Sequence, residues 1–137
     1  MKLSGNFDVS GVIAKEDERY KVIDNTTLNN LVLSSTKLNP GHSTYRSQTC
    51  GQEEVYIFVS GVGNMTLTYP DGKEENFSVT NGDIVLIEDD VHHRVFNNAR
   101  MNYTLFAFLM EKDLTRLNLC SKSFFKCFRP TSSCCRP

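Results

Sequence analysis

Glu54 and His93 are the two residues of this 137-residue sequence whose side chains could do chemistry together. Glu54 opens a β-rich run over residues 54–59, and His93 opens a shorter run over residues 93–96. A carboxylate beside an imidazole changes the proton affinity of both groups, and such a pair can serve general acid–base catalysis. Because the two residues are far apart in the sequence, the fold has to bring them together.

Strand geometry indicates which side chains accompany this pair. Side chains alternate between the two faces of a strand, so Tyr56 shares a face with Glu54 and adds a phenol to the carboxylate. The same alternation predicts the residues that line the interior around Glu54 and His93: Phe58, Val95 and Asn97.

Short strand-like runs separated by turn residues predict an all-β fold. The runs cover residues 31–33, 36–38, 54–59, 64–69, 77–79, 84–87, 93–96 and 103–110. Turn residues separate several of them, at positions 39–41, 70–72 and 81–82. Such a series is typical of an antiparallel sandwich or barrel.

Residues 41–61 resemble the first signature motif of the cupin family. That motif consists of a glycine, five residues, His-x-His, four residues, a glutamate, six residues and a glycine. Gly41, Glu54 and Gly61 match it in register, whereas Ser47 and Thr49 stand in place of the two histidines.

Residues 82–97 resemble the second cupin motif, which is a glycine, five residues, Pro-x-Gly, two residues, a histidine, three residues and an asparagine. Gly82, His93 and Asn97 match it without a gap, whereas Glu88 and Asp90 replace the proline and the glycine. The two motifs have the order and spacing of the family. The resemblance implies a double-stranded β-helix, the jelly-roll barrel of the cupins.

The resemblance also implies which residues surround the pair. Ser47 and Thr49 would share the barrel interior with Glu54 and His93, and Tyr45 would join them. A cupin metal ion usually has three imidazoles and one carboxylate as ligands, but Ser and Thr hydroxyls are poor ligands for zinc, iron or nickel. We therefore expect either no cofactor or a weakly bound divalent metal ion held by Glu54 and His93.

Three functions are open for this cavity. The first is isomerase- or epimerase-type proton transfer on a small, carbohydrate-related molecule, because the resemblance includes metal-independent sugar-nucleotide epimerases and ketoisomerases. His93 would then act as base or acid, Glu54 would orient it, and Tyr56 or Tyr45 would be the proton partner. The second is a non-catalytic cupin that binds or senses a metabolite. The third is a metal-dependent dioxygenase or lyase, against which the missing histidines count.

Length and composition indicate a single domain with three parts. We expect residues 1–30 to cover the barrel or a dimer interface, residues 31–112 to form the barrel, and residues 113–137 to form a tail. The tail is rich in Cys, Phe and basic residues, and its cysteine spacing matches no usual zinc motif. We expect it to contain no catalytic residue.

Charge and hydropathy limit the partners. The chain has 15 Lys and Arg against 16 Asp and Glu, and this balance does not indicate a nucleic-acid-binding protein. It also has neither the pattern of a signal peptide nor the ~20 consecutive apolar residues of a membrane span. We therefore expect a cytoplasmic protein that binds a small-molecule ligand and neither nucleic acid nor a membrane.

Three of the strand-like runs, residues 55–59, 84–87 and 105–109, are apolar on both faces. A strand with one face in water should alternate, so a continuous apolar run needs cover on both sides. The barrel interior is one cover. Because cupins commonly dimerise through sheet faces, we expect a second subunit to be the other; the alternative is that residues 1–30 cover the sheet.

Overall fold

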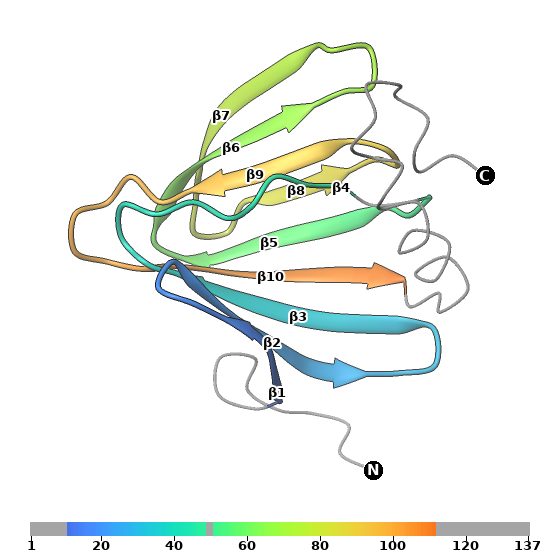
Figure 1. The fold of residues 1–137 in the computed structure, drawn as a ribbon, viewed down its shortest axis with the longest axis horizontal. Helices are drawn as coiled ribbons and strands as arrows, with labels where there is room; N and C mark the ends of the chain where they lie inside the picture. Colours follow the sequence, from blue (N-terminus) through green and yellow to red (C-terminus); the bar gives the residue numbers. More distant parts are fainter. Residues whose placement is uncertain (1–10, 49–50, 112–137) are drawn as a thin grey trace.

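The structure is a computed structural model, and it describes residues 11–48 and 51–111. The regular elements of these residues are β-strands, arranged in two facing antiparallel sheets (Figure 1). Each strand belongs to one sheet only, so the described ladders do not close around a full barrel. The predicted all-β jelly-roll architecture is confirmed.

The first sheet has six strands, and strands distant in sequence are neighbours in it. Its order is β1 (Val12–Glu16), β2 (Tyr20–Thr27), β3 (Leu31–Leu38), β10 (Thr104–Glu111), β5 (Glu54–Ser60) and β8 (Ile84–Ile87). The second sheet has four strands, in the order β4 (Ser47–Gln48), β9 (His92–Phe96), β6 (Val62–Thr68) and β7 (Glu74–Thr80). Of the predicted site residues, Ser47 lies on β4, Glu54, Tyr56 and Phe58 lie on β5, and His93 and Val95 lie on β9, so the site draws on both sheets.

Residues 12–27 extend the six-stranded sheet at its edge, because β1 pairs with β2 and β2 pairs with β3. The sequence pattern did not predict these two strands. β1 is exposed along its whole length, so it lacks the alternation of apolar and polar residues that marks a half-buried strand. The predicted tail, residues 113–137, lies outside the described residues.

The inner faces of the two sheets meet in one hydrophobic core. Phe58 on β5 and Phe106 on β10 contact each other with ring centroids 5.3 Å apart, and each is 1% exposed. Met65 and Leu67 on β6 complete the core from the opposite sheet. Burial of such a side chain stabilises the fold by roughly 1.5–3 kcal/mol, which makes these residues the main support of the site.

Gly61 forms the tight connection between β5 and β6. Its φ angle is +85°, and a Cβ atom at this position would lie 2.6 Å from the carbonyl oxygen of Tyr103. A side chain here would therefore collide with backbone as well as strain its own residue. This glycine ends the first motif, and its place in the turn explains why a larger residue does not fit there.

Candidate functional site

The structure brings Glu54 and His93 together between the two sheets. His93 lies on β9 and Glu54 at the start of β5, and both are buried while their strand neighbours are half-buried or exposed, so both side chains point inward. The Nε2 atom of His93 is 3.4 Å from Oε2 of Glu54, and the two side chains are 2% and 5% exposed. This is an ion-pair distance in an almost dry environment.

Ser47 and a backbone carbonyl hold the imidazole of His93 in place. β4 pairs with β9 so that Ser47 lies opposite His93, and its Oγ atom is 3.0 Å from Nε2. On the other side of the ring, Nδ1 is 3.3 Å from the carbonyl oxygen of Val91. A carbonyl can only accept a hydrogen bond, so this contact favours a proton on Nδ1 and leaves Nε2 to face Ser47 and Glu54.

The carboxylate of Glu54 faces Nε2 of His93 at ion-pair distance. Within the described residues Oε2 of Glu54 has no hydrogen bond of good geometry, although it lies within ion-pair distance of Nε2. A bare carboxylate oxygen facing an imidazole lone pair would be repelled, and a buried polar atom without a partner costs about 1–3 kcal/mol. One proton on either group removes the repulsion. A ligand atom can therefore donate the hydrogen bond that Oε2 of Glu54 lacks.

Tyr56 adds a protonated hydroxyl to the pair. Its ring lies edge-on to the imidazole of His93, with centroids 5.3 Å apart and an interplanar angle of 81°. Burial, and after it the charge of the neighbouring Glu54 carboxylate, raises the pKa of Tyr56 well above its usual range. At neutral pH the phenol is therefore protonated, and it can donate a proton but is a poor base.

The other described residues predicted to line the interior contribute to core packing and backbone hydrogen bonding. Phe58 and Val95 are part of the hydrophobic core. Asn97 is fully buried, and its side-chain amide donates to the carbonyl oxygens of Leu38 and Asn102. Asn97 therefore ties three chain segments together, which accounts for an asparagine at the end of the second motif. Thr49 lies outside the described residues.

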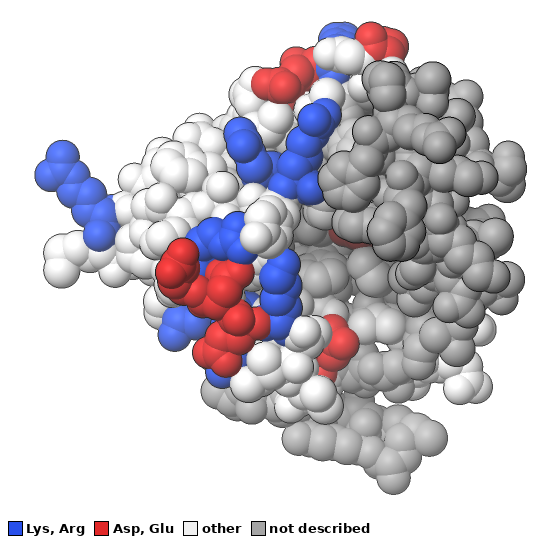
Figure 2. Space-filling model, in the orientation of Figure 1, with Lys and Arg blue, Asp and Glu red and all other residues white. Residues whose placement is uncertain are grey.

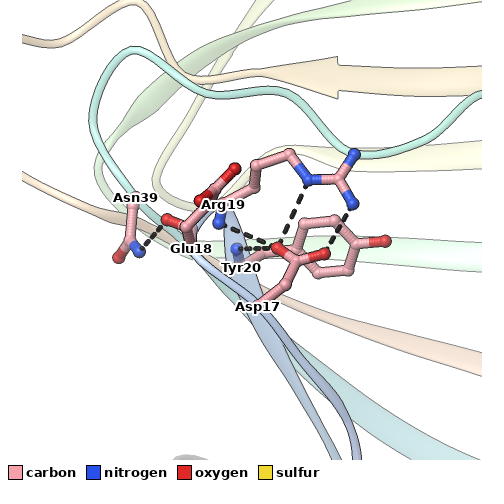
Figure 3. Close-up of polar contacts among 5 residues, drawn as sticks. All are labelled: Asp17, Glu18, Arg19, Tyr20 and Asn39. Atoms are coloured by element: carbon pink, nitrogen blue, oxygen red, sulfur yellow. Dashed lines mark hydrogen bonds and ion pairs between the residues drawn. The ribbon is translucent and has the colours of Figure 1, made fainter.

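Tyr45 has a different environment from the one expected, in which it joined Glu54 and His93. The Tyr45 side chain is 55% exposed, and the guanidinium of Arg19 lies over its ring at 3.8 Å. Arg19 belongs to the turn between β1 and β2, where it is paired with Asp17 (Figure 3). This contact could not be predicted, because β1 and β2 have no local strand signal.

A tightly bound transition metal does not fit the donors of this site. His93 and Glu54 supply one imidazole and one carboxylate, and the third contact is the hydroxyl of Ser47, a poor ligand for such metals. Over residues 11–48 and 51–111 no three His, Cys, Asp or Glu side chains converge on one point. The chemistry that these side chains can supply by themselves is proton transfer.

Comparisons with known proteins agree with the fold. No protein-family model and no curated protein sequence matches the chain. The cupin domain of Schizosaccharomyces pombe Cnp3 matches the structure with a TM-score of 0.60 and 7% identity, over 74% of this chain and 71% of that one. The polyketide cyclase RemF from Streptomyces resistomycificus matches with a TM-score of 0.63 and 16% identity, over 82% and 81%. A predicted oxalate decarboxylase from Thermotoga maritima matches with a TM-score of 0.58 and 18% identity, over 67% and 79%.

The chain thus has the fold of the cupins, as its two motifs predicted. At these identities the likeness concerns the fold alone, and the chemistry has to be argued from the residues of this chain. Of the described residues, no helix has the length and hydropathy needed to cross a membrane.

Proposed function

We propose that this protein is a small-molecule cupin that moves a proton on a carbohydrate-related ligand, in the manner of an isomerase or epimerase. The observation that carries the proposal is the position of Nε2 of His93, which contacts both Ser47 and Glu54 beside the ring of Tyr56. Two titratable groups and a phenol in one buried site are the elements of general acid–base catalysis.

Each side chain has a defined role in this proposal. The Glu54–His93 pair donates its proton to the ligand from Nε2 and takes a proton back from another ligand atom. Glu54 stabilises the imidazolium ion whenever the ring carries both protons. Tyr56 is a second proton donor, since its raised pKa keeps the hydroxyl protonated. Ser47 positions the ring through its contact with Nε2.

The structural relatives support the small-molecule part of this proposal. Two of them bear the names of enzymes with small substrates, a polyketide cyclase and a predicted oxalate decarboxylase. They do not bear on the reaction type, which rests on the Glu54–His93 pair and on the resemblance to sugar-modifying cupins.

Proton transfer to a ligand carbon can be measured without knowing the product. The protein is incubated in D₂O with a panel of aldoses, ketoses, sugar phosphates and nucleotide sugars, and loss of ligand C–H signals is followed by NMR. We expect deuterium to enter at a carbon next to a carbonyl. His93→Asn should slow this exchange by roughly 10²–10⁴-fold, the usual contribution of an acid–base group. Tyr56→Phe should slow it less if His93 still acts.

Matched variants separate this result from a general loss of structure. Tyr69→Phe removes a phenol that contacts Glu75, and His42→Asn removes an imidazole outside the pair, so both should leave the exchange rate unchanged. Ligand binding that maps to Glu54, Tyr56 and His93 without any exchange would reject the catalytic part of the proposal. Exchange that survives His93→Asn would reject the assigned residue.

A second candidate function is ligand binding without catalysis. The near-complete burial of Glu54, Tyr56 and His93 limits ligand access for either function, but the contacts of both ring nitrogens of His93 with Ser47 and Val91 favour binding without proton transfer. In that case a metabolite would bind with a slow association rate, and isothermal titration would detect it while the exchange experiment would not. A divalent ion added alone tests the remaining expectation: if one binds weakly, Glu54 and His93 are the residues that would hold it.

The proposed assembly is a homodimer formed through the outer face of the six-stranded sheet. Ile57 on β5 pairs with Ile84 on β8, and the two are 42% and 63% exposed. Leu86 on β8 and Leu109 on β10 lie beside them, both next to Val55. A contiguous apolar surface of this kind is typical of a protein–protein interface. A second copy of the chain would bury it by an isologous contact.

A further inference from the structure

A small polar hollow lies on the outer face of the four-stranded sheet. Its volume is about 200 Å³, and the residues that line it are mostly charged or hydroxyl-bearing: Arg46, Thr66, Thr68, Glu74, His92, His93 and Arg94. His92 and Arg94 alternate along β9 with the buried His93, so they point away from the core. The His93 side chain is buried on the opposite face of β9, so the charged groups of the hollow and the Glu54–His93 pair lie on different faces of this strand.

The strand register builds this hollow from three neighbouring strands. On β6, Thr66 lies opposite Arg94 and Thr68 lies opposite His92. On the other side of β6, Thr68 lies opposite Glu74 of β7. In Figure 2, blue Lys and Arg side chains gather over β6 and β9, and red carboxylates lie above them toward the turn between β6 and β7.

The two arginines supply positive charge and unused hydrogen-bond donors. Among the described residues neither Arg46 nor Arg94 forms an ion pair, whereas Arg19 does. Burial lowers the pKa of His92, and the positive charge of Arg46 lowers it further, which places Arg46 close to the imidazole. Nδ1 of His92 is buried and has no hydrogen-bond partner in the described part of the chain.

Glu74 is the acidic residue of the lining, and the charge of Asp90 also acts on His92. Glu74 lines the hollow, accepts a hydrogen bond from the hydroxyl of Thr68 at 3.5 Å, and accepts another from the amide of Asn76 at 3.1 Å. The hydroxyl of Thr66 donates to Asn76 at 2.6 Å. Both threonine hydroxyls are therefore engaged, and the guanidinium groups of Arg46 and Arg94 are the donors left for a ligand.

We propose that this hollow is a second binding site, for a small anion of the phosphate or carboxylate class. Guanidinium groups present paired N–H donors that match the oxygens of both anions. A volume of about 200 Å³ is below the roughly 300–1,000 Å³ of sites for drug-sized ligands, so a free anion or one anionic group fits. Residues 114–137 contain five basic side chains and no acidic one.

The inference goes beyond the proposed function, since the anion would bind on the face of β9 opposite to His93. It is tested on the full chain by titration with inorganic phosphate, followed by ¹H–¹⁵N NMR at constant ionic strength with chloride as the reference. We expect saturable shifts of the amides of Thr66, Thr68 and Arg94. A parallel titration with acetate separates a carboxylate site from a phosphate site.

Four variants distinguish a built site from general charge attraction. Arg46→Gln and Arg94→Gln should each weaken phosphate binding by at least about tenfold, as expected for the loss of a charge-assisted contact. Arg94→Lys keeps the charge but loses the paired donors, and its affinity should lie between those of Arg94→Gln and the wild type. Glu74→Gln removes the opposing charge and should tighten binding several-fold.

Arg100→Gln is the matched control, because it removes the same charge from an exposed residue that does not line the hollow. Its phosphate affinity should equal that of the wild type, and thermal melts should show all five variants folded. Non-saturating shifts equal to those in chloride would overturn the inference. So would an equal loss of affinity in Arg100→Gln and Arg94→Gln. Because phosphate binding is read out without any reaction, a failure of the acid–base proposal would leave this test unaffected.

Discussion

The outer faces of the two sheets differ in chemistry, although their inner faces share one core. On β8 of the six-stranded sheet the outer face is apolar, with Ile84 and Leu86 at 63% and 69% exposure. On the four-stranded sheet the outer face is polar, and the hydroxyl of Thr66 there bonds to the side chain of Asn76. One surface is suited to another protein surface and the other to water and small polar ligands.

This difference can be followed in the sequence through strand periodicity. β6 alternates strictly between buried residues such as Met65 and Leu67 and half-buried polar ones such as Thr66, as expected for a strand with one wet face. β8 alternates equally in burial, but all four of its residues are apolar. β8 thus alternates in burial but not in hydropathy, and this disagreement is the basis of the proposed dimer.

The largest effect is expected inside the core, where Phe106 and Leu109 on β10 allow the inner and outer faces to be compared. Phe106 is 1% exposed and Leu109 is 38% exposed. Phe106→Ala should reduce the free energy of unfolding by about 3–5 kcal/mol, because it leaves a cavity among Tyr56 and Phe58. Leu109→Ala should cost less than ~1 kcal/mol in urea unfolding at low protein concentration.

Equal losses for the two variants would contradict the comparison, because they would show that the outer face of β10 is as well covered in the monomer as the inner face. Measuring the unfolding of both variants at high protein concentration also tests whether a second subunit covers Leu109. Leu109→Ala should then lose additional stability if a second subunit buries this side chain.

A smaller effect is expected for the proposed dimer. Ile57→Lys and Leu86→Lys each place a charge on the apolar outer face, and each should raise the dimer dissociation constant by about 100-fold or more, equivalent to ~2.7 kcal/mol. Light scattering at several concentrations measures this change. Thr66→Lys is the matched control on the four-stranded sheet and should leave the mass unchanged. A wild-type chain that is monomeric at micromolar concentration would reject the dimer.

Much of the fold could be predicted because local signals agreed with the tertiary structure. The turn residues at 39–41, 70–72 and 81–82 form turns in the structure, with left-handed glycines at Gly41, Gly72 and Gly82. The two motifs placed Glu54 and His93 in register. Strand parity then predicted that Tyr56 accompanies them, since period-two alternation leaves one choice of face.

Other parts of the structure have no local signal. β2 is held by pairing with β3, and β1 by pairing with β2, rather than by their own periodicity, so the sequence pattern presented residues 12–27 as a covering segment. The environment of Tyr45 depends on the turn between β1 and β2, which was not predicted either. Asn97 was assigned to the pocket because its motif position faces inward, but parity indicates only a direction. Strand parity does not show that the side-chain amide of Asn97 already donates hydrogen bonds to the carbonyl groups of Leu38 and Asn102.

The smallest effect is expected at the turn between β1 and β2, which separates the contacts of Tyr45 from those of His93. Asp17 accepts hydrogen bonds from the backbone amides of Arg19 and Tyr20, and it also pairs with the guanidinium of Arg19 (Figure 3). Hydrogen bonds from the side chain and backbone of Arg19 are the main causes that lower the pKa of Asp17 from 3.8 to about 2. Because the folded-state pKa is below the unfolded value, Asp17 stabilises the fold fully above pH ~4, and this contribution is lost as the pH falls toward 2.

Asp17→Asn should therefore lower the melting temperature at pH 6, and the difference from the wild type should shrink below pH 4 and vanish near pH 2. Glu18→Gln removes the same charge from the adjacent residue, whose backbone carbonyl accepts from Asn39 and does not depend on the carboxylate. This control should show a smaller difference at pH 6. A pH-independent effect of Asp17→Asn would show that the charge of the Asp17 carboxylate does not stabilise the turn. The exchange activity assigned to His93 should not change in Asp17→Asn if Tyr45 belongs to this turn and not to the site. A loss of that activity would return Tyr45 to the list of proton partners.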